Sequence, residues 1–339
     1  MKKMTFLTLV FWLTAGAWVA GPDPIAAEEA YFKGKTIRII AAIGPGGLLD
    51  FHARVTARHL PKYIPGKPSI IVQNMPGGRG NIAGNYTYNI AKPDGLTILM
   101  PLTGMPLQPV LGIEGIRYDP TKMFWLGSLS KSEYVLIIRS DRPYKTIQDV
   151  RKAKGPVYLG AQPGTGVFTI TRLMMKVLKL PVEIIRYTSG TEIDLAIQRG
   201  EVDGRATTIP TFMTRNQDWM QSRFVNVFVQ VTEERHPSFP DIPTLVELVP
   251  QHKALIDLAT AQNTWMGSLT LPPRVPEAQA RLLRQAFRKM IEDPQFKKEL
   301  KVAANMAPTS GEQLEKKINK VAATPPKRRQ VLRQLWGLK

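Results

Sequence analysis

The sequence predicts an α/β protein built from two units, and three observations support this. Short apolar runs typical of strands alternate with stretches whose apolar residues recur at helical spacing. Two of these runs end in glycine-rich clusters, GPGGLLD at residues 44–50 and PGGRGN at residues 76–81. A second set of strand–glycine–helix junctions follows residues 118–120, and 339 residues suffice for two domains of common size.

The first unit is predicted to repeat the order strand, glycine-rich turn, helix, which favours parallel strands. After the first strand, Leu49, Ala53, Ala57 and Leu60 fall on one helical face. A second helix is expected to begin near Asn81. The predicted strands cover residues 36–42, 69–73 and 96–100.

The second unit has junctions of its own. Residues 164–166 open one predicted helix, and residues 189–191 precede another, which Gly200 closes. The predicted strands of this unit cover residues 134–138, 157–161, 182–187 and 225–231. Beyond them the chain is more helical, with an amphipathic helix expected at residues 277–293.

The first residues are typical of a cleavable secretion signal. Lys2 and Lys3 precede an apolar run at residues 4–17, which is too short to span a membrane and is followed by small residues. A buried N-terminal helix is the alternative. We predict a soluble periplasmic protein with a signal peptide at residues 1–27. We expect residues 28–128 to form domain 1, residues 129–255 domain 2, and residues 256–339 the completion of domain 1 with C-terminal helices.

Charge and residue types exclude several kinds of site. The chain has no cysteine, which excludes disulfides, thiolate metal sites and cysteine nucleophiles, and its four histidines form no HExxH pair. We therefore expect no metal and no cofactor. The net charge of +19 favours anionic partners. Nucleic acid is not expected, because the basic residues are scattered and no nucleic-acid-binding motif is present.

The densest basic segment is the C-terminal tail, residues 327–339. Val331, Leu332, Leu335 and Trp336 recur there at helical spacing. A terminal helix that docks its apolar face is the simplest interpretation. Binding to a membrane surface or to a partner is the alternative.

The glycine-rich clusters have two interpretations. In an open parallel sheet, ligands lie beyond the carboxyl ends of the strands, where helices begin and free N–H groups point outward. Glycine at such a junction lets a carboxylate, phosphate or sulfate approach the backbone. We interpret the clusters as anion cradles that face a cleft between the two units. Ordinary tight turns are the alternative.

The sequence matches known enzyme motifs only weakly or not at all. Residues 78–83 fit a dinucleotide fingerprint only loosely, and no acidic residue clearly ends the following strand. Neither a GxxxxGK[ST] loop nor a GxSxG elbow is present. Glu201 and Asp203 lie two apart on a predicted strand. Asp203 either binds or orients something, or caps a turn at Gly204.

At these motifs the chain resembles the periplasmic solute-binding receptors of tripartite tricarboxylate transporters, the Bug family. The resemblance runs from about Phe32 to Leu314. Motifs of the family appear in the family's order: PGGxxD at 45–50, VxNxPGxxGN at 72–81, the PDG region at 91–99, YDP at 118–120, GTG at 164–166, GEVD at 200–203 and PDIPT at 240–244.

The resemblance implies a two-domain periplasmic-binding-protein-like fold that closes on an organic acid in the cleft, like a Venus flytrap, and hands it to a membrane permease. Asp50 is expected to cap the first helix rather than to contact an anion. By motif position, the first wall would comprise Gly46, Gly47, Gly80 and Asn81, with Thr103. The opposite wall would comprise Gly164, Thr165, Gly166, Gly190, Thr191 and Asp203.

Some residues depart from the family pattern. Val167 and Phe168 lie where a Ser-His pair is frequent, and Arg205 where the family is usually apolar. One hypothesis is that Val167 and Phe168 favour an apolar or aromatic acid, and another is that Arg205 instead holds a second carboxylate. In a third interpretation, Phe168 and Arg205 face away from the cleft. We predict a monomeric, non-enzymatic receptor for a carboxylate. A sensory protein that presents its ligand to a membrane kinase, and an unrecognised enzyme on the same fold, are the alternatives.

Overall fold

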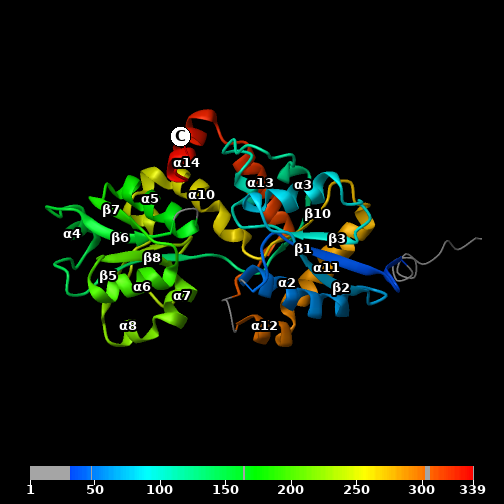
Figure 1. The fold of residues 1–339 in the computed structure, drawn as a ribbon, viewed down its shortest axis with the longest axis horizontal. Helices are drawn as coiled ribbons and strands as arrows, with labels where there is room; N and C mark the ends of the chain where they lie inside the picture. Colours follow the sequence, from blue (N-terminus) through cyan, green and yellow to red (C-terminus); the bar gives the residue numbers. More distant parts are fainter. Residues whose placement is uncertain (1–30, 47, 163–164, 302–305, 339) are drawn as a thin grey trace, which may run out of the picture.

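The computed structural model describes residues 31–46, 48–162, 165–301 and 306–338. They form two α/β units that lie side by side, each around its own sheet (Figure 1). The predicted α/β class with two units is confirmed. The predicted signal peptide lies outside the described residues. Within them, no helix is long and apolar enough to cross a membrane.

The first unit contains a six-stranded mixed sheet in the order β11-β4-β10-β3-β1-β2. β1 pairs in parallel with β2 and β3, so the parallel strands predicted from the glycine-rich junctions are confirmed. β10 is antiparallel to β3 and β4, and β11 is antiparallel to β4. The strands are β1 Thr36–Ala41, β2 Ser69–Asn74, β3 Thr97–Met100, β4 Phe124–Ser128, β10 Leu269–Leu271 and β11 Thr309–Ser310.

Helices pack on this sheet through apolar faces. In α11, Leu283, Phe287 and Met290 recur three and four residues apart and are fully buried, which is why the amphipathic pattern at 277–293 forms a helix here. The helices of this unit are α2 Leu48–His59, α3 Asn81–Asn89, α11 Glu277–Glu292, α12 Pro294–Lys301 and α13 Gly311–Ala322. Short 3-10 turns lie at Leu60–Tyr63, Gly78–Gly80, Met105–Leu107, Pro120–Lys122, Pro250–His252 and Ala261–Trp265.

The second unit contains a five-stranded sheet in the order β7-β6-β8-β5-β9. β6 is parallel to β7 and β8, whereas β5 is antiparallel to β8 and β9. The strands are β5 Tyr134–Arg139, β6 Val157–Ala161, β7 Val182–Arg186, β8 Gly204–Thr208 and β9 Val225–Val231. The helices are α4 Ile147–Arg151, α5 Gly166–Leu178, α6 Gly190–Arg199, α7 Ile209–Arg215 and α8 Gln217–Gln221.

The chain passes between the units more than once. It leaves the first sheet after β4 and returns to it with β10. The return passes through α9 (Leu245–Leu248) and α10 (Lys253–Thr260). The last helix, α14 (Pro326–Leu335), follows α13 of the first unit but lies against α5 of the second (Figure 1).

One local prediction is wrong. Glu201 and Asp203 do not lie on a strand, because α6 ends at Gly200 in the left-handed region (φ 77°) and residues 201–203 form a bend before β8 begins at Gly204. Asp203 therefore lies at the amino end of β8.

Candidate functional site

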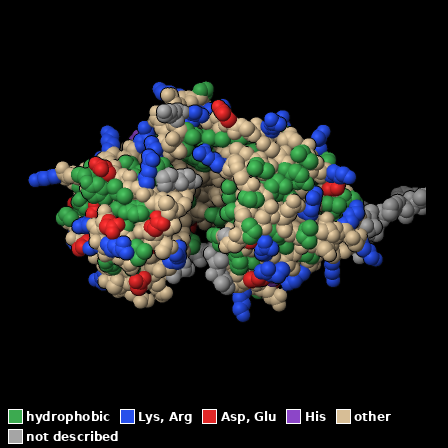
Figure 2. All heavy atoms as spheres, viewed as in Figure 1, with side chains coloured by type: hydrophobic (Ala, Val, Ile, Leu, Met, Phe, Trp, Pro, Cys, Tyr) green, Lys and Arg blue, Asp and Glu red, His purple; other side chains and the backbone are tan. Residues whose placement is uncertain are grey.

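A cavity of about 640 Å³ lies between the two units. Figure 2 shows the two lobes and the hollow that separates them. Residues of both units, of the connecting segment and of the C-terminal segment line the cavity. They are Arg79, Leu102, Thr103, Gly104 and Gln108; Ser132, Tyr134, Thr165, Gly166, Phe168, Thr169, Arg172 and Arg186; Gln262 and Met266; and Trp336 and Gly337.

Sheet topology brings the second-unit residues to one place. Thr165 follows the carboxyl end of β6, and Arg186 is the last residue of the parallel strand β7. Tyr134 begins β5, which runs antiparallel, so its amino end lies at the same edge of the sheet. In the first unit, Thr103 follows β3 in the same way. The cavity therefore lies where ligands of open α/β sheets bind, beyond the carboxyl ends of parallel strands.

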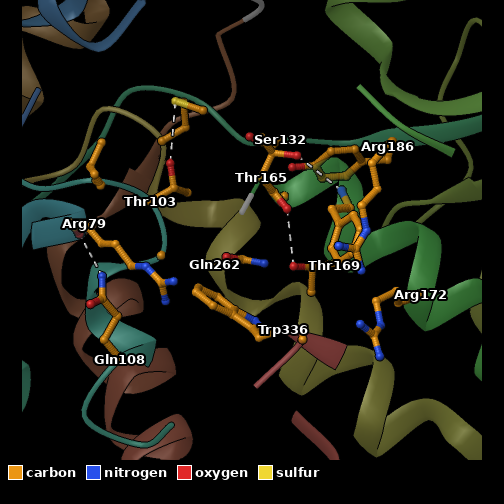
Figure 3. Close-up of a pocket in the computed structure, with 17 residues that line it drawn as sticks. Arg79, Thr103, Gln108, Ser132, Thr165, Thr169, Arg172, Arg186, Gln262 and Trp336 are labelled. Carbon is orange, nitrogen blue, oxygen red and sulfur yellow. Dashed lines mark hydrogen bonds between the residues drawn. The ribbon is translucent and has the colours of Figure 1, made fainter. Parts of the chain in front are cut away.

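Three arginines give the cavity its charge. Arg79 comes from the first unit, and Arg172 and Arg186 come from the second. In Figure 3, Arg79 and Arg172 reach into the view from opposite sides of the cavity. Among the described residues, no Asp or Glu lines the cavity and none forms an ion pair with these three guanidinium groups. The charge of the cavity therefore favours an anion.

Arg79 is held in an unusual backbone conformation. Its φ of 57° lies in the left-handed region, which costs a non-glycine residue on the order of 1 kcal/mol. The buried Gln108 donates a hydrogen bond from Nε2 to the Arg79 carbonyl oxygen at 2.8 Å, as Figure 3 shows. This contact fixes the turn from which the Arg79 side chain enters the cavity.

Neutral hydrogen-bonding side chains lie on the wall that the second unit forms, opposite Arg79. Thr165 caps α5, since its Oγ1 accepts from Phe168 N at 3.3 Å. Burial raises the pKa of Tyr134 to about 12, although its hydrogen bond with Ser132 acts in the other direction, so the phenol keeps its proton at neutral pH. A Cβ on Gly166 would lie 2.4 Å from the Tyr134 hydroxyl oxygen. Glycine is therefore required there by the close approach of the phenol.

The structure brings together some of the residues predicted for the site and separates others. Thr103, Thr165, Gly166 and Phe168 line the cavity. Gly47 and Gly164 lie outside the described residues. The other predicted residues are not among those that line it: Gly46, Gly80, Asn81, Gly190, Thr191, Asp203 and Arg205.

The glycine-rich clusters have partners within the chain. The Gly46 N–H donates to Asp50 Oδ2 at 2.9 Å, so a carboxylate of the protein occupies the first turn. Asn81 Oδ1 accepts from the Tyr118 hydroxyl at 2.9 Å, and Gly80 packs against Leu102. The contact between Gly46 and Asp50 in the first cluster is typical of an ordinary tight turn, which was the alternative interpretation. The second cluster reaches the cavity through the Arg79 side chain.

Four residues predicted for the second wall, Gly190, Thr191, Asp203 and Arg205, do not line this cavity and have partners within the protein. Asp203 lies at the amino end of β8, away from the cavity edge, where it accepts from Tyr158 N at 2.7 Å and pairs with Arg142 at 2.7 Å. Arg205 is buried and pairs with Asp194 at 2.8 Å.

Burial lowers the pKa of Arg205, and Asp194 acts against that shift. Arg205 also donates to the Gly190 carbonyl oxygen at 2.9 Å, and Thr191 Oγ1 accepts from Arg215 at 3.0 Å. The described second-unit residues that line the cavity come from around the start of β5, from the first part of α5 and from the end of β7, and not from α6 or β8.

Several cavity residues were missed from the sequence. Arg172 follows Phe168 by four residues in α5 and so shares its helical face, a spacing that the sequence already contained. Arg79 lies inside the second glycine-rich cluster. Gln262 comes from a distant segment that no local pattern marked. Trp336 belongs to the apolar pattern of the C-terminal tail, but nothing in that pattern connected it with the cavity.

A metal site is not evident in this geometry. Within the described ranges, no three His, Asp or Glu side chains lie together as a metal ion would need.

Comparison with known proteins identifies the family of this chain. The family model described as tripartite tricarboxylate transporter family receptor matches residues 53–337. The chain belongs to this receptor family. A UPF0065 protein of Bordetella pertussis is 26% identical over 286 residues, which cover 80% of this chain and 82% of the relative.

Solved structures agree with this receptor fold. A TctC solute-binding protein from Polaromonas aligns with a TM-score of 0.70 at 18% identity, over 89% of this receptor and 98% of that chain. MatC from Rhodopseudomonas palustris, with bound malate, aligns with a TM-score of 0.57 at 18% identity. The alignment covers 88% of this receptor and 99% of MatC. An R. palustris protein with adipate aligns with a TM-score of 0.60 at 16% identity, over 89% of this receptor and 97% of that chain.

Proposed function

We propose that this receptor binds a small organic carboxylate between its two units in the periplasm, closes on it, and delivers it to the membrane permease of a tripartite transporter. The observation that carries the proposal is the set of three cavity arginines without carboxylate partners among the described residues. Guanidinium groups bind carboxylates in paired hydrogen bonds, which are stronger than neutral ones. The malate and adipate held by two structural neighbours are acids of this class.

The arrangement of the arginines also favours closure. Arg79 belongs to the first unit, and Arg172 to the second. A ligand that contacts both gains more contacts when the units approach each other, and such differential contact is what shifts an open–closed equilibrium. Binding needs no bond to form or break, so the proposal includes no chemical step.

The test is thermal unfolding of the purified protein against a panel of mono-, di- and tricarboxylates, aromatic acids and amino acids. A ligand at 100 times its Kd stabilises the folded state by about 2.7 kcal/mol, which raises the Tm by several degrees. Titration calorimetry of the best ligand then compares Arg79→Gln and Arg172→Gln with Arg151→Gln, an exposed arginine of α4 outside the cavity.

We expect the two cavity variants to bind about tenfold or more weakly, because each loses a charged hydrogen bond of roughly 1.5–3 kcal/mol, and Arg151→Gln to bind like the wild type. Equal affinities in all three variants would place the ligand elsewhere and contradict the proposal. Small-angle scattering with the same ligand tests closure, which predicts a smaller radius of gyration in the bound state.

A further inference from the structure

The C-terminal segment, residues 326–338, connects the two units at the cavity. Arg333 donates from its guanidinium to the Leu111 carbonyl oxygen of the first unit. The same helix, α14, packs against α5 of the second unit, and its Leu332 and Leu335 are buried in the largest apolar core. Figure 1 shows the path of this helix from α13 to the second unit. The helix is therefore docked on both walls of the cleft, as the terminal-helix interpretation predicted.

The end of α14 directs Trp336 into the cavity. Gly337 adopts a φ of 74° and donates its N–H to Gln334 O at 3.0 Å, while Leu338 N donates to Arg333 O at 2.9 Å. These two bonds form a Schellman motif, which ends the helix and fixes the direction of the chain. Trp336 is the residue just before this turn, and its ring lies in the middle of the cavity view, beside Gln262 (Figure 3).

The ring lies against the first unit, and the next residue, Gly337, lies beside the second. A Cβ on Gly104, in the first unit, would lie 2.6 Å from Trp336 Cη2. A Cβ on Gly337 would lie 3.4 Å from Arg172 Nη1 and 3.9 Å from Phe168 Cε1 of the second unit. Trp336 and Phe168 are thus two aromatic residues that line the same cavity, and Trp336 lies between Arg79 and Arg172 in Figure 3.

The indole also has an unsatisfied donor. Trp336 Nε1 is buried and has no acceptor among the described residues. A buried donor without an acceptor is costly, so a ligand oxygen that reached Nε1 would remove that cost.

We infer that Trp336 is a specificity-determining residue of the binding site, supplied by the C-terminal segment, and that it selects an anion with a flat, π-rich body. The inference rests on the proposed carboxylate-receptor function. Carboxylates at opposite ends of such a body would meet Arg79 and Arg172, while its face would pack on the rings of Trp336 and Phe168. A planar ring stacks on indole better than a puckered saturated ring of the same size does.

The test uses two matched probes, benzene-1,4-dicarboxylate and trans-cyclohexane-1,4-dicarboxylate, which differ in flatness and keep both carboxylates. Titration calorimetry measures both Kd values for the wild type, Trp336→Leu, Trp336→Phe and Val331→Ala. The last is a matched control on the same helix, outside the cavity. We expect the wild type to prefer the planar probe by about threefold to tenfold. Val331→Ala and Trp336→Phe should keep most of this preference, and Trp336→Leu should lose it.

A second measurement observes the wild type directly and does not depend on Trp336→Leu. The indole N–H resonance of Trp336, assigned by its loss in Trp336→Phe, should shift when the planar probe is added. The inference is overturned if Trp336→Leu keeps the preference, if the resonance does not move, or if the wild type binds neither probe or binds both equally. In those last two cases, a different carboxylate whose binding depends on Arg79 would leave the proposed function standing.

Discussion

Asn74, the last residue of β2, donates from Nδ2 to Asp50 Oδ1 at 2.7 Å and thereby joins the two glycine-rich turns. The same amide also donates to the Ile43 carbonyl oxygen at 3.1 Å, just before the first turn begins. The other carboxylate oxygen of Asp50 accepts from Gly46 N at 2.9 Å and from Arg54 Nε at 3.0 Å. An aspartate of the protein therefore satisfies the turn that the sequence indicated as an anion cradle.

Asp50 should make stability depend on pH in acid. Burial acts to raise its pKa, but the hydrogen bonds from Arg54, Gly46 and Asn74 outweigh burial and lower it from 3.8 to about 2. Because the folded-state pKa lies below the unfolded one, the contribution is complete above about pH 4 and is lost as the pH falls through 2. Between about pH 4 and pH 2, the free energy of unfolding of the wild type should fall by about 2 kcal/mol more than that of Asp50→Asn, as measured by urea unfolding. The exposed Asp241→Asn is the control and should follow the wild type.

His52 should make stability depend on pH in a higher range. Its ring is fully buried, neither ring nitrogen has a partner among the described residues, and burial lowers its pKa from 6.5 to about 4. The unfolded chain takes up the proton first, so stability is present above about pH 6.5 and falls as the pH approaches 4.

Over this pH range, the free energy of unfolding of the wild type should fall by about 3 kcal/mol more than that of His52→Gln, as measured by urea unfolding. His252→Gln, a histidine only partly buried, is the matched control and should keep the wild-type slope. Parallel curves for wild type and His52→Gln would mean that folding does not change the pKa of His52.

Asp194 should be essential to stability because of Arg205. Their ion pair is 2.8 Å long, and the side chains are only 7% and 16% exposed. Asp194→Ala leaves a buried guanidinium without its charge partner, a loss that typically costs about 3–5 kcal/mol. Denaturant unfolding of this variant and of Glu183→Ala, an exposed carboxylate of β7, measures the difference.

The double variant Arg205→Met with Asp194→Leu should recover most of that loss, since it removes both charges from the interior. A single variant as stable as Glu183→Ala would show that Arg205 does not need this partner. That outcome would restore the possibility that Arg205 is available to a ligand.

The seven predicted strands could be found because each is a largely apolar run bounded by turn residues. The strands β4, β8, β10 and β11 were missed, since they are short or, like β8, rich in small and polar residues. The strands at 157–161 and 225–231 have the predicted bounds, and the strand predicted at 36–42 ends one residue earlier. The wrong strand at Glu201 and Asp203 has a local cause as well. Gly200 ends α6 and the chain needs three more residues to reach the sheet.

The site was less predictable because it depends on the faces that tertiary packing selects. Thr165 and Gly166 were found, since a helix that follows a strand marks the ligand edge of a sheet. The sequence places Arg205 two residues after Asp203, but this position does not indicate that the Arg205 guanidinium forms an ion pair with Asp194 of α6. Trp336 comes from the end of the chain, and only the docking of α14 brings it beside Thr103 and Arg172.

Gly104 should be required for the position of Trp336. Its φ of −81° is open to any residue, so the need for glycine arises from the ring, whose Cη2 would lie 2.6 Å from a new Cβ. Gly104→Ala should cost about 1–3 kcal/mol, the usual range for overpacking, in urea unfolding. In a Trp336→Phe background, which removes Cη2, the same substitution should cost about 1 kcal/mol less. Gly155→Ala, with no atom within 4 Å of the new Cβ, is the control. Equal costs for Gly104→Ala in both backgrounds would mean that Trp336 does not press on Gly104 in solution, and that the C-terminal segment is not held against the first unit at this point.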